Sequence, residues 1–296
     1  MNTSAHATAA IAVDRIDAAL PAAAQVVGIG PRRWEQLADP ALRMAAAFWF
    51  SVAVLGQLLF AVYVAGFYGR AAVQGRPETW NQVLPHGYVA GDTFLNLVLG
   101  LHLLFAVAVT VGGTLQLIPQ IRRNAPGFHS WNGRAYLLLT AVVSVGGLIM
   151  VWTRDTVGDL SQHVAISLNA LLILTCAGIA WRHARARRFD LHRRWALRLF
   201  LAVSGVWFFR VGLMFWIVVN QGPVGFDPKS FTGPFLTFLA FAQYMLPLGV
   251  LELYFRAQQR REARGQLAMA AGLGILTLPM MVGIVAAAAI MWLPHL

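Results

Sequence analysis

The hydrophobic positions of this chain fall into long apolar runs that are separated by short polar segments. A helix needs about 20 mostly apolar residues to cross the hydrocarbon layer of a bilayer. The runs that approach or exceed this length cover residues 44–67, 93–118, 137–152 with its flanks, 163–181, 197–219, 235–255 and 267–293. The pattern therefore predicts an all-α, polytopic membrane protein with seven transmembrane helices.

The composition supports this class, because 58% of the 296 residues are hydrophobic, 12% are charged and the mean hydropathy is +0.62. These values lie outside the range of soluble domains. Residues 1–41 are predicted to form a cytoplasmic tail rather than a cleaved signal, since charged residues interrupt their Ala-rich stretch. Residues 42–296 are predicted to form one membrane domain. Its functional core is a four-helix group, helices two to five (residues 93–219), and the other three helices are expected to be peripheral.

The basic residues indicate the orientation of the chain. Lys and Arg collect on the cytoplasmic side of membrane proteins, and most of the 23 here lie in the tail and in alternate loops, after helices two, four and six. The other side has Arg70, Arg76, Arg154 and Lys229. We therefore expect a bacterial inner-membrane protein with a cytoplasmic N-terminus and an external C-terminus. The net charge of +11 indicates contact with membrane lipid rather than with nucleic acid.

Missing motifs narrow the range of functions. The sequence has no phosphate-binding glycine loop and no common hydrolase signature, which argues against nucleotide chemistry and hydrolysis of these kinds. Cys176 is the single cysteine, so an internal disulfide and a cysteine-ligated metal cluster are excluded.

Four histidines recur regularly along helices two to five. His102 and His163 lie toward the outer side, and His129 and His192 lie at the inner helix ends. The outer pair is 61 residues apart and the inner pair 63, which is one helical hairpin in each case. Neutral imidazoles are good axial ligands for haem iron. The pattern predicts two b-type haems, one near each membrane surface, with these four histidines as metal ligands.

An alternative applies to each histidine singly. Histidines at helix ends commonly lie in the headgroup layer, and this interpretation stays open for His129 and His192. His102 differs, because it lies in the apolar segment GLHLLFAV, where an ionisable residue is costly and usually functional.

The segment FHSWNGRAY, residues 128–136, adds candidate cofactor contacts. Arg134 and Tyr136 follow His129 by about one and a half to two helical turns, so we expect them to bind the propionates of an inner haem. In the same segment Asn132 is a candidate helix cap. Arg210, in VWFFRVGLMFW, is expected to bind the propionates of the outer haem, at the depth of the outer histidines. Binding of either arginine to lipid phosphate is the alternative.

Other intramembrane residues have simpler explanations. Glu252 is expected to pair with Arg256 one turn later. Asp92 and Asp159 stand at the outer mouths of helices two and four, where they either orient histidines or end the helices.

Glycine pairs at 112–113 and 146–147 lie within helices two and three. They are expected either to let helices approach closely or to make room for a macrocycle.

Several segments together carry a family resemblance. GTLQLIP, IRR, FHSWNGRAY, LHRRWALRLF and FFRVGL resemble the bacterial membrane-protein family catalogued as domain of unknown function 2306, over roughly residues 95–219. The family name implies no activity. The layout of four histidines on four successive helices is also similar to the dihaem cytochromes of the b561 and ferric-reductase type, and that similarity implies transmembrane electron transfer.

These observations lead to one functional expectation and two alternatives. The expectation is electron transfer across the membrane through two bis-histidine b-type haems, with a quinol, a small reductant or a partner redox subunit as donor. Whether the chain is itself a haem b-dependent oxidoreductase stays open. The alternatives are a transporter or sensor without haem that binds an anionic ligand or lipid, and an assembly subunit.

Overall fold

The computed structural model describes residues 33–84, 86–154 and 158–296. Regular structure in these ranges is helical, apart from an isolated bridge between Asp227 and Thr232. The longer helices are α2 (Arg33–Val64), α4 (Thr93–Leu117), α6 (Pro126–Arg154), α7 (Leu160–Arg185), α8 (Phe189–Val203), α9 (Gly205–Val219), α10 (Pro234–Arg260) and α11 (Ala263–Ala286). Short helical segments join them, namely η1 (Ala65–Gly69), α3 (Arg70–Val73), η2 (Pro77–Gln82), α5 (Pro119–Asn124), η3 (Ala287–Trp292) and η4 (Leu293–His295). The all-α prediction is confirmed.

The expected cytoplasmic tail falls mostly outside the described residues, which begin at Arg33. Residues 38–296 form one compact unit. The first apolar helix is longer than predicted, since α2 begins at Arg33 rather than at residue 44.

Six helices in the described ranges are long and apolar enough to cross a membrane, and the bent pair α8–α9 makes a seventh span if counted as one. The predicted number of spans is thus confirmed. The fifth span, predicted as one helix over residues 197–219, is instead bent into α8 and α9. α8 and α9 meet at Ser204 with a bend of 50°. The Ser204 hydroxyl donates to the carbonyl oxygen of Phe200 at 2.8 Å, four residues earlier. Serine bonds of this kind bend helices.

Buried amides from other helices stabilise the bend. Gln57 of α2 donates to the Ser204 hydroxyl at 2.9 Å, and Asn169 of α7 donates to the Ala202 carbonyl oxygen at 3.2 Å. A break in a helix leaves backbone carbonyls without partners, and in lipid these must be satisfied by protein groups. The break therefore depends on side chains that are remote in the sequence.

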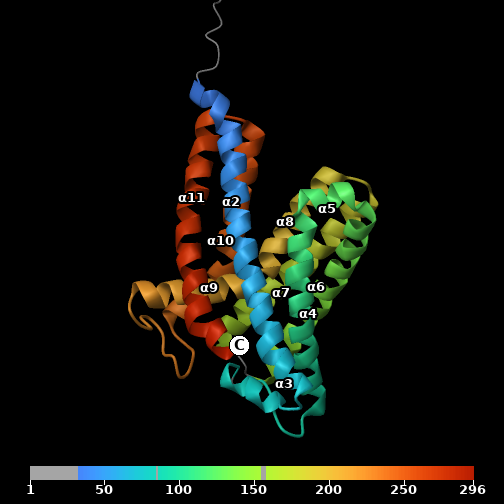
Figure 1. The fold of residues 1–296 in the computed structure, drawn as a ribbon, viewed down its shortest axis with the longest axis vertical. Coiled ribbons are helices and arrows are strands. Elements are labelled where there is room, and N and C mark those ends of the chain that lie inside the picture. Colours follow the sequence, from blue (N-terminus) through green and yellow to red (C-terminus); the bar gives the residue numbers. More distant parts are fainter. Residues whose placement is uncertain (1–32, 85, 155–157) are drawn as a thin grey trace, which may run out of the picture. The chain divides into compact units, whose positions relative to one another are not determined.

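Four helices form the bundle that was predicted as the core: α4 packs along α6, α6 along α7, and α7 along α8 (Figure 1). We call it the α4–α8 bundle. Its buried side chains are small or aliphatic around one aromatic ring, namely Val109, Tyr136, Ile173, Cys176, Ala177, Leu199 and Ala202.

The remaining helices are not merely peripheral. α2, α9 and α11 contribute to a larger hydrophobic cluster that contains Tyr63, Trp207 and Trp292. α2 comes so close that a Cβ at Gly56 would lie 2.7 Å from side-chain atoms of both Trp207 and Ile284. This cluster also includes Leu99 of α4 and Met150 of α6, so it joins the four-helix bundle to the remaining helices.

Candidate functional sites in the α4–α8 bundle

His192 is held by the neighbouring helix α7. Its Nδ1 lies 2.9 Å from the carbonyl oxygen of Ala180. A carbonyl oxygen only accepts, so this contact places a proton on Nδ1 and leaves Nε2 of a neutral ring with a free lone pair. The HRRWALR segment therefore fixes the orientation of an imidazole at this end of the bundle.

The same segment links α8 to α10. Arg198 Nε donates to Glu252 Oε1 at 2.7 Å, and its guanidinium lies 4.7 Å from the ring centre of Trp195. The expected pairing of Glu252 with Arg256 is therefore wrong. Arg256 lies one turn from Glu252 on the same helix, but the fold brings Arg198 of α8 into hydrogen-bonding distance instead.

The segment FHSWNGRAY joins α6 to α4. Asn132 Nδ2 donates to the carbonyl oxygen of Gly112 at 2.9 Å, and Gln116 Nε2 donates to that of His129 at 2.9 Å. Asn132 is thus not a helix cap, since α6 already begins at Pro126. Its amide links two helices instead, which is the common use of amides in lipid.

Arg134 and Tyr136, the two residues of this segment expected to bind propionates, point to different sides of α6. Residues two positions apart on a helix point in directions roughly 200° apart around its axis. Accordingly Arg134 is exposed, whereas Tyr136 is buried, with 7% of its surface exposed. Tyr136 packs on Gly113, where a Cβ would lie 2.8 Å from its ring. The two side chains therefore do not contact one ligand together, because the helical period directs them to different sides.

The inner histidines lie at corresponding positions near the starts of α6 and α8. His192 is close enough to act electrostatically on His129. The Nδ1 atom of His129 is buried and has no hydrogen-bond partner within the described ranges. This end of the bundle thus holds two imidazoles from different helices, one of them oriented and the other with an unused nitrogen.

The outer histidines lie against different parts of α6. His102 faces the glycine pair, with its Cε1 3.4 Å from where a Cβ at Gly147 would lie. The His163 ring instead packs edge-on against Trp152, with 5.6 Å between ring centres. Five residues separate these two positions on α6, which is about 140° around the helix. The two outer histidines therefore contact different sides of α6.

His102 lines a cavity of about 400 Å³ between α4 and α6. The other lining residues are apolar, and His163 is not among them. Groups of three or more His, Cys, Asp or Glu side chains that could hold a metal ion do not occur in the part of the chain that the structure describes.

Arg210 follows the bend at Ser204, so its predicted position along a straight fifth helix does not apply. Its Nη1 donates to the carbonyl oxygen of Val206 at 3.2 Å, and its guanidinium lies 5.3 Å from the ring centre of Phe60. It is close enough to act electrostatically on His102. The guanidinium of Arg210 thus contacts a backbone carbonyl and an aromatic ring in the structure, whereas haem propionates were the expected partners.

The region with this geometry was compared with known proteins. Residues 99–246 match the model of a family described as "Predicted membrane protein (DUF2306)", which is half of the chain. The chain belongs to this family. The resemblance seen in the sequence is confirmed, and the DUF2306 region contains all four of the patterned histidines. No match was found among curated proteins or among solved structures.

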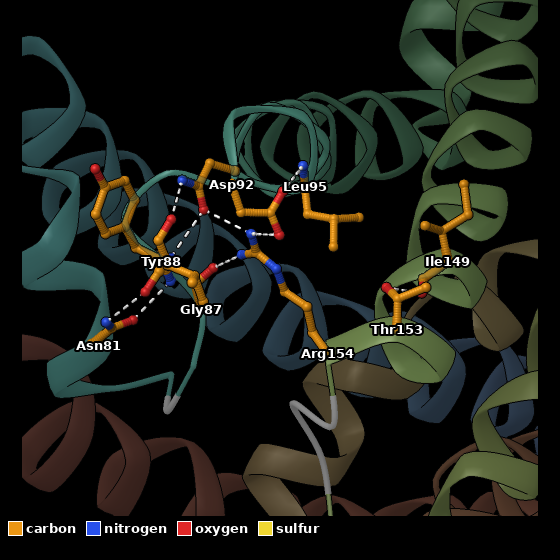
Figure 2. A network of polar contacts seen from close by, with 10 residues as sticks. Asn81, Gly87, Tyr88, Asp92, Leu95, Ile149, Thr153 and Arg154 are labelled. Atoms are coloured by element: carbon orange, nitrogen blue, oxygen red, sulfur yellow. Dashed lines mark hydrogen bonds and ion pairs between the residues drawn. The ribbon is translucent and has the colours of Figure 1, made fainter.

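A polar network at the other end of α4 and α6 was not predicted. Arg154, the last residue of α6, donates to Asp92 Oδ2 at 3.1 Å, to Asn96 Oδ1 at 2.8 Å and to the carbonyl oxygen of Gly87 (Figure 2). Its side chain is 3% exposed. The Arg154 network therefore joins the end of α6 to the start of α4 and to the preceding loop.

Local hydrogen bonds orient the side chains that accept from Arg154. Asp92 caps α4 by accepting from the backbone N–H of Leu95 at 3.1 Å. This N–H, and then the guanidinium of Arg154, hold the pKa of Asp92 below its ordinary value. Asn96 exchanges two hydrogen bonds with the backbone of Val89. Arg154 is one of the few basic residues on the side poor in Lys and Arg, which was the signal in the sequence, but its partners lie 58 and 62 residues away.

Proposed function

We propose that this membrane protein transfers electrons through one b-type haem held by His129 and His192. The proposal is supported by two observations: His192 of α8 acts electrostatically on His129 of α6, and the His192 ring is oriented by a backbone carbonyl. Haem would supply one-electron chemistry, and the chain would supply its ligands and their orientation.

The residues present fit such a group. The carbonyl oxygen of Ala180 holds the Nδ1 side of His192, and an iron-ligating histidine typically donates its other nitrogen to a carbonyl in this way. The Nδ1 atom of His129 is buried and has no hydrogen-bond partner among the described residues, so this nitrogen is available as a second ligand to iron. Arg122 acts electrostatically on His129 and is exposed, so a cation is near for a carboxylate edge.

An outer haem is not part of the proposal, because His102 and His163 contact different parts of α6. The electron donor is proposed to be a quinol, a small reductant or a partner redox subunit. We further propose the inner-membrane location with a cytoplasmic N-terminus, based on the placement of the basic loops. Reporter fusions after Asn124 and Arg261 should then read cytoplasmic, and fusions after Gly69 and Gly225 external. The reverse pattern would contradict this orientation.

An absorbance spectrum of the purified protein tests the haem proposal. We expect Soret and α bands that sharpen on reduction with dithionite, and a content of one haem per chain. His129→Ala and His192→Ala should each abolish the bands. The matched controls are His102→Ala and His163→Ala, which should keep them.

Two results would overturn the proposal. Folded protein without these bands, expressed with sufficient haem, would exclude haem binding. A control variant that loses haem, or a content of two per chain, would contradict the assignment to the inner pair. Without haem, the exposed residues Arg122, Arg123 and Arg134 at the same end of the bundle favour the alternative, a transporter, sensor or assembly subunit that binds an anionic ligand or lipid.

A further inference from the structure

An open cavity between α4 and α6 is large enough for a small molecule. Its volume of about 400 Å³ falls within the range of roughly 300–1,000 Å³ that is typical of ligand pockets. Its walls include Val98, Phe105 and Ile149. Leu101 and Val142 also line it and are 41% and 44% exposed, so the cavity borders the surface that faces lipid.

His102 is the polar side chain in this lining. Its Nδ1 lies 3.7 Å from where a Cβ at Gly146 would be, and it is buried without a hydrogen-bond partner in the ranges that the structure describes. Nδ1 is therefore the nitrogen with which a ligand would pair, because the ring otherwise hydrogen-bonds to the backbone of Val143. A buried polar group without a partner is costly, which favours a ligand that hydrogen-bonds to the imidazole.

The lining determines the chemistry of that ligand. It contains no Lys, Arg, Asp or Glu, so it does not suit the charged headgroup of a phospholipid. A plain acyl chain would fill the apolar volume but would leave Nδ1 of His102 without a hydrogen-bond partner. A neutral ring that carries oxygen atoms and an apolar tail satisfies both conditions, and it reaches the site through the membrane.

We propose that the cavity between α4 and α6 binds the ring of a membrane quinone, with His102 hydrogen-bonding to one of its oxygens. The glycine pair of α6 leaves space beside the imidazole, and the exposed aliphatic edge receives the tail. This site is separate from the inner histidine pair. Its occupation does not require haem, although a quinol bound here would be a suitable electron donor for the proposed function.

Binding of decylubiquinone to the full chain in detergent tests the inference, with quenching of tryptophan fluorescence as the signal. We expect saturable binding that decylbenzene, which has a ring and the same tail but no oxygen, does not displace. His102→Leu keeps most of the volume but removes the hydrogen bond, and should weaken binding about tenfold. His102→Gln, which restores a polar group, should recover part of the affinity.

A matched pair of bulky substitutions locates the site. Ala141→Trp fills the cavity and should abolish binding, whereas Ala108→Trp, on the exposed side of α4 outside the lining, should not change it. The measurement is repeated in His192→Ala, where binding should persist even if that variant lacks haem. The absence of saturable binding, equal competition by decylbenzene or unchanged affinity in His102→Leu would each overturn the inference.

Discussion

The two ends of the α4–α6 helix pair use a glycine pair in opposite ways. At the Asn132 end, Gly112 and Gly113 lie against Asn132 and Tyr136, and the helices are in direct contact. At the Arg154 end, Gly146 and Gly147 lie beside His102, and a cavity remains. There the helices are joined beyond the cavity, by the Arg154 network.

The difference shows that a glycine pair does not by itself determine close packing. Tyr136 fills the space that Gly113 leaves, and the Asn132 amide reaches a backbone carbonyl across the gap. His102 is shorter than tyrosine, and opposite glycines it leaves room. The side chain that the partner helix presents therefore decides whether the glycines close an interface or open a site.

The largest expected effect is at the Arg154 end. Arg154→Leu would leave the carbonyl oxygen of Gly87 without a donor, at about 1–3 kcal/mol, and would remove one of the two hydrogen bonds to the amide oxygen of Asn96. We expect the free energy of unfolding in detergent to fall by about 3 kcal/mol, measured by denaturant titration. Arg76→Leu, at an exposed position, is the control and should change it little. Equal effects of both substitutions would mean that the network does not hold this end.

The next effect is at the Asn132 end. Gly113→Ala would place a methyl group 2.8 Å from the Tyr136 ring, and overpacking of this kind costs about 2 kcal/mol. Gly178→Ala on α7 is the matched control, because a Cβ there meets nothing within 4 Å, and alanine is the better helix former. A denaturant titration should therefore show a loss of stability for the first variant and no loss for the second. If both behave alike, the contact between Gly113 and Tyr136 is not tight.

A smaller effect is expected for the amide that crosses this interface. Asn132→Ala removes the hydrogen bond to the carbonyl oxygen of Gly112, and such bonds in membranes contribute about 1 kcal/mol. The exposed neighbour Ser130 provides the control substitution, Ser130→Ala. The same titration would contradict the role of Asn132 if its loss cost no more than that of Ser130.

The smallest effect is the response of the Arg154 end to acid. The folded state lowers the pKa of Asp92, so its carboxylate contributes stability above the ordinary pKa, about 4, and loses it as the pH falls through the lowered value. The Tm should therefore fall more steeply below pH 4 in the wild type than in Asp92→Asn. Identical pH profiles would show that Asp92 does not contribute to acid sensitivity.

Much of the fold was predictable because each transmembrane span is a local property. An apolar run of sufficient length must form a helix, since its backbone finds no other partners in lipid. The candidate site was predictable in part. The spacing of His129 and His192 placed them near the starts of α6 and α8. Helical spacing did not say that the His102 ring would lie beside Gly147 and the His163 ring against Trp152.

The sequence by itself determined the membrane class, the spans, the family and the unusual character of His102 in an apolar helix. Only the tertiary structure decided the partners of the polar side chains. Arg198 pairs with Glu252 across 54 residues, and Arg154 reaches Asp92 across 62. The bend at Ser204 likewise depends on amides of α2 and α7. Local sequence sets the period and length of each helix, but the choice of a hydrogen-bond partner depends on which helices pack together, and that choice is made by the whole chain.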